Sequence, residues 1–268
     1  AQGLELLRSL PHTLARDEQE LDYLIALGAA MDTAGSFDHG EIETIFLRAR
    51  ALCHQRGESR KLWPILSGLF WTHFYRGQHY QARRYGEEML QISSAETDPV
   101  PRLAANVILG LEANVFGDFV NGMAYLEQAL TLYDSMELQE VGFRFNNYDL
   151  KLEGLGCLAQ ARWFTGYPDQ AKQLNEYALQ LATQTGHPFI LGQGLLNIVW
   201  QLELHREFVQ TRIQAAALAR LASEHGYHLM VSHALIYDGA AMFEQGESEA
   251  GLARLLQGIS DLRASGNT

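Results

Sequence analysis

The chain is poor in several residue types, and each scarcity limits what it can do. It holds only three lysines, Lys61, Lys151 and Lys172, and its formal net charge is -12 at pH 7 with a sequence pI near 5.2. A surface that binds the phosphate backbone needs clustered positive charge, so we expect no nucleic-acid binding by this segment. No uninterrupted hydrophobic run is long enough to cross a bilayer. We therefore expect a soluble, cytoplasmic protein without membrane contact.

Residues and motifs that carry chemistry are equally scarce. The two cysteines, Cys53 and Cys157, have no CxxC partner, which is typical of reduced, buried thiols. The sequence contains no Walker A, HExxH, EF-hand or GxSxG motif, and its histidines lack metal-ligand spacing. Residues 154–159 match GxGxxA, but they lie inside a predicted helix, whereas a dinucleotide site needs a preceding strand. We predict no enzyme activity, no cofactor and no metal.

What the sequence does contain is a long repeat. A glycine, once replaced by arginine, recurs about every forty residues between helix-like stretches, at Gly35, Gly77, Gly117, Gly166, Arg206 and Gly246. The fifth residue after it is always small: Gly40, Ala82, Gly122, Ala171, Thr211 and Gly251. Leucine and small residues precede this turn position at fixed offsets, and an aromatic residue follows it in five of the units. A fixed period of this kind predicts stacked helical hairpins.

This pattern of leucine, small residues, a turn glycine and an aromatic resembles the tetratricopeptide repeat. Its best units are LGLEANVFGDFVNGMAYLEQAL (109–130) and LAQARWFTGYPDQAKQLNEYAL (158–179). The period exceeds the roughly 34 residues of that repeat, so each helix is about a turn longer. HEAT and armadillo units have the right length but are not defined by this glycine spacing. We predict an all-α fold, an α-solenoid of about six tetratricopeptide-like hairpins forming a single superhelical domain over 1–268.

The turn positions fix an approximate map of the helices. The first helix of each hairpin is predicted near 17–34, 59–76, 100–116, 150–165, 189–205 and 229–245. The second is predicted near 38–56, 79–95, 119–136, 168–185, 207–225 and 248–264. Gly57, Gly186, Gly226 and Gly266 stand where C-terminal caps with positive φ are useful. No segment alternates with period two, so we expect essentially no sheet.

The resemblance implies that the first helices line a concave groove, with residues ten, six, three and two before the turn glycine pointing into it. Applied to this chain, it selects Ser67, Trp71, Phe74, Tyr75, Asn114, Gln160, Trp163, Phe164, Trp200, Glu203 and Phe243. Aromatic residues interleaved with amides and a carboxylate suit a peptide, because rings supply rigid area and amides pair with an extended backbone. The alternative is that large residues merely fill the inside of a tight superhelix.

One step of the repeat is irregular. From Gly117 to Gly166 the spacing is forty-nine residues, and the surplus falls around 137–149. Long connections in compact helical arrays are often functional or disordered. Phe143, Phe145 and Tyr148 argue against plain disorder. We expect this insertion to fold over the groove or to dock against another domain, and its position beside Trp163 favours the groove.

Almost the whole chain is similar to the tetratricopeptide region of large bacterial signalling ATPases of the STAND type. The similarity rests on SLPHTLARDEQELDYLIALGAAM (9–31), ARALCHQRGE (49–58), WFTGYPDQAKQLNEYALQLATQTGHPF (163–189) and ARLLQGISDLRASG (253–266). It implies an adjacent ATPase and an effector, which is an adenylate or guanylate cyclase domain, a kinase or a DNA-binding domain. The stretch FRFNNYDLKLEGLG (143–156) departs from cyclase-linked relatives and leaves the effector open. We expect the chain to be a piece of a longer protein.

Three functions are compatible with these observations. The leading hypothesis is a non-catalytic sensor and protein-interaction module, whose ligand or partner in the groove regulates the adjacent ATPase. The second is an oligomerisation arm that assembles protomers through exposed repeat faces. The third is a receptor for a small molecule or peptide pheromone with a closed groove.

Overall fold

The protein folds into a series of α-helices. The computed structural model describes residues 6–7, 11, 13–34, 39–58, 61–94, 98–135 and 149–265, without the side chains of 32–34 and 39. Twelve helices are bounded within these ranges, which contain no strand. They are α2 (Leu14–Ala34), α3 (His39–Arg56), α4 (Leu62–Tyr75), α5 (His79–Ser93), α6 (Val100–Val115), α7 (Phe119–Ser135), α8 (Leu150–Phe164), α9 (Pro168–Thr185), α10 (Pro188–Leu204), α11 (Phe208–His225), α12 (His228–Glu244) and α13 (Ser248–Ala264).

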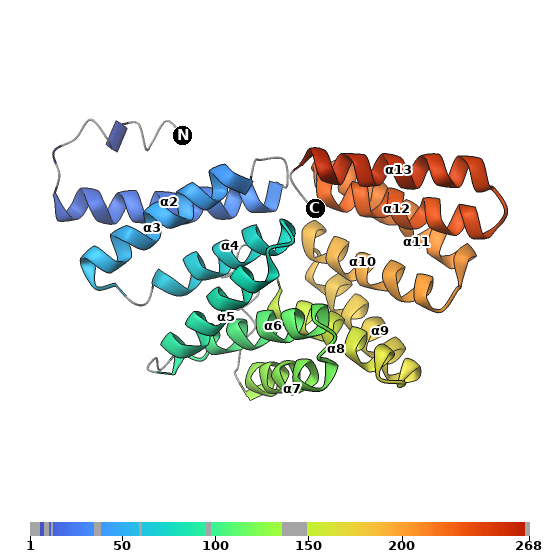
Figure 1. Ribbon diagram of the computed structural model, residues 1–268, viewed down its shortest axis with the longest axis horizontal. Coiled ribbons are helices and arrows are strands. Elements are labelled where there is room, and N and C mark those ends of the chain that lie inside the picture. Colours follow the sequence, from blue (N-terminus) through green and yellow to red (C-terminus); the bar gives the residue numbers. More distant parts are fainter. Residues whose placement is uncertain are drawn as a thin grey trace.

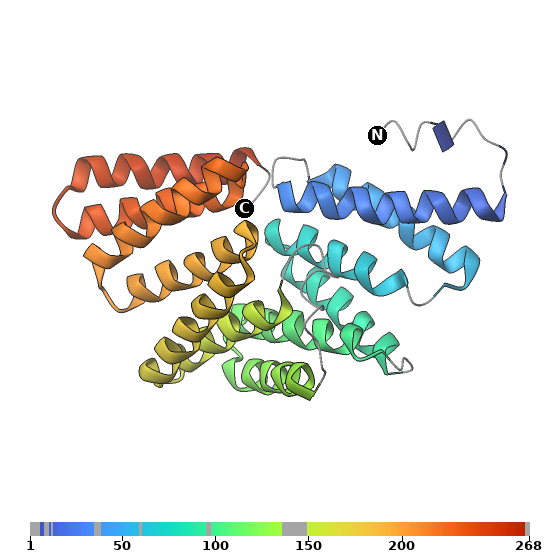
Figure 2. The same cartoon turned by 180° about the vertical axis from the view of Figure 1, so that it is seen from behind.

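Successive helices pair into six hairpins, from α2–α3 to α12–α13. The hairpins stack into an arch, in which an N-terminal arm and a C-terminal arm meet through α6 to α8 (Figures 1 and 2). We call the even-numbered helices the first helices and the odd-numbered ones the second helices. The predicted α-solenoid is confirmed, and every predicted helix lies within a few residues of an observed one.

Small residues bring the two helices of a hairpin together, as the repeat predicts. Ala82, Ala171 and Thr211 are buried at the start of their second helices. In the last hairpin the approach is closest, because Gly239 and Gly251 face each other. A Cβ added to either glycine would lie 2.7 Å from the carbonyl oxygen of the other. The backbones of α12 and α13 therefore pack directly against each other.

The turn within each described hairpin uses a left-handed residue. Gly77, Gly117, Gly166 and Gly246 have φ between 65° and 92°. Arg206, which occupies the glycine position of the fifth hairpin, adopts φ 58° and is the one non-glycine residue with positive φ in the described part of the chain. Its prediction as a glycine substitute is confirmed. Gly35 lies outside the described residues.

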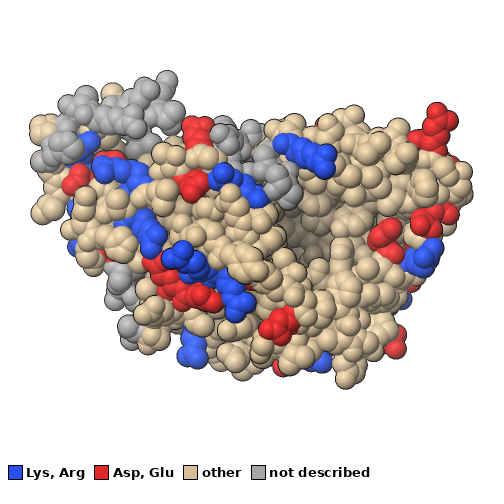
Figure 3. Space-filling view, viewed as in Figure 1, with Lys and Arg blue, Asp and Glu red and all other residues tan. Residues whose placement is uncertain are grey.

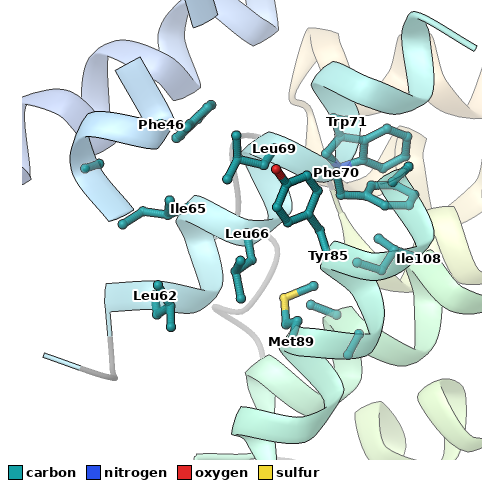
Figure 4. Packing of buried hydrophobic residues seen from close by; sticks show 14 of the residues in the cluster. Phe46, Leu62, Ile65, Leu66, Leu69, Phe70, Trp71, Tyr85, Met89 and Ile108 are labelled. Carbon is teal, nitrogen blue, oxygen red and sulfur yellow. The ribbon is translucent and has the colours of Figure 1, made fainter. Parts of the chain in front are cut away.

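The largest core cluster fills the N-terminal arm. Leu66, Leu69 and Phe70 of α4 pack against side chains of α3, α5 and α6, including Met89 of α5 (Figure 4). Phe46 of α3 is fully buried. Its ring occupies the space that side chains at Gly28 and Gly68 would need, since their added Cβ atoms would lie 2.6 and 2.2 Å from it. Smaller clusters continue the core through the C-terminal arm.

Candidate functional site

A cavity of about 190 Å³ lies on the concave side of the arch. Figure 3 shows this face hollowed between the two arms. All lining residues come from the first helices of the last five hairpins or from the N-cap residue of α12. They are Trp71, Phe74, Tyr75, Leu111, Glu153, Phe189, Gln193, Leu196, Asn197, Tyr227, Leu229, Met230 and His233. The cavity thus joins residues that are far apart in the sequence.

One part of the lining is aromatic. At the end of α4, Trp71 stacks on Tyr75 with ring centroids 5.6 Å apart and meets Phe74 edge to face at 5.5 Å. In the C-terminal arm, Phe189 and Tyr227 make an edge-to-face contact at 5.2 Å. These are favourable pair geometries, so the rings hold one another in place and present rigid apolar area to the cavity.

Another part of the lining is polar and lies on α8, α10 and α12. The N-cap of α8 fixes the start of its helix, because the Asp149 carboxylate accepts hydrogen bonds from the backbone N–H groups of Lys151 and Leu152. Glu153 follows one turn later. Its Oε1 accepts from the Cys157 thiol at 3.7 Å, and its Oε2 accepts from Gln193 Nε2 at 3.5 Å. Both contacts are long, so the carboxylate is weakly satisfied.

Burial shapes the protonation of these groups. It raises the pKa of the Glu153 carboxyl to about 7 and holds the pKa of the Cys157 thiol well above its usual value. Burial also lowers the pKa of His233, whose Nδ1 lies 2.9 Å from the backbone oxygen of Leu229. A neutral His233 that donates from Nδ1 keeps Nε2 as an acceptor. Near neutral pH, Glu153 therefore titrates while its neighbours stay uncharged.

The structure brings three of the predicted groove residues to the cavity, namely Trp71, Phe74 and Tyr75. Ser67, one turn earlier on α4, is fully buried and presents no surface to a ligand. Asn114 is also buried, and its Nδ2 donates to the backbone oxygen of Cys157 at 2.8 Å. In this structure Asn114 joins α6 to α8.

The remaining predicted residues lie along the first helices outside the cavity lining. Gln160 accepts a long hydrogen bond from Asn114 Nδ2 at 3.4 Å, and Trp163 packs on His205 with ring centroids 4.2 Å apart. Phe164 is exposed and lies 6.2 Å from Trp200, measured between ring centroids.

The last of the predicted site residues are Glu203, Phe243 and the three aromatic residues of the insertion. Burial raises the pKa of Glu203, and Phe243 is exposed. The predicted contacts Phe143, Phe145 and Tyr148 lie outside the described residues.

The polar residues of the lining were not among the predicted groove residues, although the repeat places them at a fixed position. Glu153, Gln193 and His233 stand thirteen residues before the turn residues Gly166, Arg206 and Gly246. The groove rule of the shorter repeat stops ten residues before the turn. Because these helices are about a turn longer, they add one more inward-facing position. A rule extended by one turn would have selected all three residues.

The described residues also limit other chemistry. They contain no group of His, Cys, Asp and Glu side chains that could hold a metal ion. None of the described helices is long and apolar enough to cross a membrane. Cys53 and Cys157 are free and buried, as predicted. Residues 154–159 lie within α8, so they do not form a strand-to-helix phosphate loop.

The fold belongs to a known structural class, that of tetratricopeptide-like helical repeats. Among solved structures, a Rap protein complexed with Competence and Sporulation Factor superposes with a TM-score of 0.65 at 11% identity, covering 92% of this chain and 78% of that one. PlcR of Bacillus thuringiensis, in complex with the peptide PapR7 and DNA, gives 0.60 at 11% identity over 82% and 80%. BtubC (BKLC) from P. vanneervenii gives 0.57 at 15% identity over 91% of each chain.

Sequence comparison is less informative than structure. No protein-family model matches the chain. An uncharacterized protein of Rhizobium meliloti (strain 1021) is 22% identical over 268 residues. The match covers 98% of this chain and 26% of the relative, so the chain spans about a quarter of that protein's length.

Proposed function

We propose that this chain is a non-catalytic sensor module that binds a peptide or small ligand in its concave cavity. The observation that carries the proposal is the cavity itself. Five successive hairpins contribute to one space that is aromatic at α4 and polar at α8 and α10. Ligand sites in proteins are typically concave and mostly apolar, with a few placed polar groups. The similar Rap and PlcR structures, solved with Competence and Sporulation Factor and with the peptide PapR7, support a ligand of peptide type.

Occupancy of the cavity can be transmitted through the shape of the arch. A ligand between α4 and α12 contacts both arms, whose first helices lie far apart in the sequence. It therefore binds one curvature of the superhelix more tightly than another, which shifts the population toward that curvature. In this proposal, an ATPase or effector domain of the same protein responds to the shift. The resemblance to STAND ATPases supports that last step.

The proposal is tested with peptides selected from a phage library of random linear heptapeptides against the immobilised chain. Their affinities are then measured by fluorescence anisotropy for three variants. Leu196→Trp fills the cavity, Phe74→Ala truncates its aromatic wall, and Tyr80→Ala removes a ring that is 80% exposed outside the cavity.

We expect at least tenfold weaker binding by Leu196→Trp and Phe74→Ala, and unchanged binding by Tyr80→Ala. Selected peptides that bind the wild type and all three variants equally would contradict a cavity site.

A second candidate function is assembly through the C-terminal end of the arch. Helix α13 packs mainly against α12 and leaves Leu252 and Leu256 about half exposed on one face. Residues four apart on a helix lie on the same face, so the pair forms an apolar stripe that a second copy of the chain could cover. Sedimentation equilibrium tests this candidate, which requires a dimer that Leu256→Glu dissociates. A wild-type monomer at 100 μM would exclude it.

A further inference from the structure

Glu153 stands in the cavity wall without a cationic partner. The lining contains no Lys or Arg among the described residues, and none of the ion pairs between described side chains involves this carboxylate. Nearby Lys151, on the same helix, pairs with Asp134 at 2.9 Å instead. Glu153 is half-buried, and carboxylates withdrawn from water in folded proteins are usually paired, because an unpaired charge loses hydration without compensation. Glu153 therefore has the chemistry of a counter-ion that lacks its cation.

Gln193 adds a second acceptor with no donor. Its side chain is 7% exposed, and Oε1 is buried without a hydrogen-bond partner. Its Nε2 group donates to Glu153, so the amide orientation is set by that contact and Oε1 stays unpaired. An unmet buried acceptor costs free energy that a donor from a ligand can recover. Glu153 and Gln193 thus offer adjacent acceptors within the same cavity.

The rest of the lining suits a cation attached to an apolar group. The rings of Trp71, Phe74, Tyr75, Phe189 and Tyr227 line the same space. Aromatic faces attract ammonium and guanidinium groups electrostatically, and their area favours apolar contact. The cavity of about 190 Å³ is large enough for one ring, since an apolar cavity of roughly 150 Å³ holds benzene.

We propose that the occupant of this cavity presents a protonated amine on an apolar group about the size of one ring. The amine pairs with Glu153 and donates to Gln193 Oε1, while the apolar group lies among the aromatic side chains. This inference rests on the proposed function and specifies its ligand chemistry. Small acids and neutral hydrophobic compounds are then disfavoured, because they leave both acceptors unsatisfied.

The titration of Glu153 gives the proposal a pH signature. Its pKa is raised to about 7 by burial, so the carboxylate is charged at pH 8 and largely protonated at pH 5.5. The other titratable groups around it are Tyr75, Cys157, Tyr227 and His233. Burial raises the pKa values of Cys157 and Tyr227 and lowers that of His233, which favours the neutral form of each. A loss of amine preference between pH 8 and 5.5 therefore reports on Glu153.

The test compares 2-phenylethylamine with its neutral analogue 2-phenylethanol and with phenylacetate, using isothermal titration calorimetry on the full chain. At pH 8 we expect the amine to bind at least tenfold more tightly than the alcohol and the acid to bind least. Glu153→Gln removes this preference, and the wild type loses most of it at pH 5.5. Glu176→Gln, on the exposed face of α9, is the matched control and keeps the preference. Equal binding of amine and alcohol at pH 8, or a preference that survives in Glu153→Gln, overturns the inference.

Further ligands identify the source of the amine. Phe-Gly-Gly-NH₂ with a free and with an acetylated N-terminus, and acetyl-Gly-Lys-Gly-NH₂, are titrated in the same way. Preference for the free N-terminus or for the lysine peptide assigns the amine to the end or the side chain of a peptide. Binding of 2-phenylethylamine without either peptide assigns it to a free small amine. Each of these outcomes supports the inference.

The inference and the proposed function fail in different ways. If selected heptapeptides lose affinity for Leu196→Trp but bind Glu153→Gln as well as the wild type, the cavity is a ligand site and the amine inference is wrong. If Leu196→Trp changes the binding of neither peptides nor 2-phenylethylamine, the cavity is not the site and the proposed function is wrong as well.

Discussion

The interior of the last hairpin and the wall of the cavity differ in how completely their groups are packed and paired. Between α12 and α13, Gly239 and Gly251 allow backbone-to-backbone packing that leaves no room for a single methyl group. In the cavity, Gln193 keeps a buried acceptor unpaired, and Glu153 keeps a carboxylate without a cation. Natural chains often retain such locally unfavourable groups at functional sites. The difference indicates that packing within the hairpins stabilises the fold, whereas the unpaired polar groups of the cavity wall lower its stability.

The largest loss of stability is expected from a substitution that forces the two helices of the last hairpin apart. Gly239→Ala places a Cβ 2.5 Å from the backbone nitrogen of Leu255, so α12 and α13 must separate. We expect the free energy of unfolding, measured by urea denaturation, to fall by about 3 kcal/mol.

The matched control for Gly239→Ala is Gly154→Ala in the N-terminal half of α8. Its nearest contact would be a side-chain carbon of Leu130 at an ordinary 3.5 Å. Alanine is the better helix former, so we expect a gain of about 0.5 kcal/mol. A similar loss in both variants would show that the close approach is unimportant.

The next effect concerns the cavity. The pKa of Glu153 rises from 4.5 to about 7 on folding, so the folded state holds a proton more tightly and is favoured at low pH. This contribution is fully present below pH 4.5 and is lost as pH rises through 7. Glu153→Gln lacks it. We expect the wild type to lose about 3 kcal/mol relative to Glu153→Gln between pH 4.5 and 8 in parallel chemical denaturations. A constant difference between the two proteins across that window would contradict the prediction.

A smaller loss of stability is expected from a substitution at Asn114, which tests whether this residue joins two helices or lines the cavity. Asn114 was predicted to face the groove, but its Nδ2 donates to the Cys157 backbone. Asn114→Ala removes this bond between α6 and α8, and the Cys157 carbonyl keeps only its hydrogen bond within the helix. We expect a loss of about 1.5 kcal/mol in the free energy of unfolding. Amine binding, measured by the same calorimetry, stays unchanged unless the residue also contacts the ligand.

The smallest effect lies in a turn. Arg206→Gly relieves a left-handed arginine, which costs about 1–2 kcal/mol, but the glycine adds chain entropy to the unfolded state. The exposed ion pair with Glu244 contributes little. We expect a net gain of about 0.5 kcal/mol by thermal or urea unfolding. Gly77→Arg, at a similar φ of 65°, is the reciprocal variant and loses about 1 kcal/mol.

Much of the fold could be predicted because its determinants are local. The turn position at Arg206 and the small residue at Ala82 both follow from spacing within one hairpin. The polar wall was missed because the groove rule stops one turn short of it. Whether α4 and α12 line the same cavity is not a local property, because it depends on the curvature of the superhelix, which sums small rotations over many hairpins. The groove rule of a shorter repeat therefore found Trp71 and missed Glu153.

The ring of Phe46 bears on how the array comes apart. In a linear stack each repeat touches only its neighbours, and terminal repeats fray first. Phe46 projects from α3 into the space left by Gly28 in its own hairpin and by Gly68 in the next. The first hairpin therefore cannot peel away without pulling an aromatic ring out of the second. Under a mechanical load from the N-terminal side, these two hairpins would yield together as one unit.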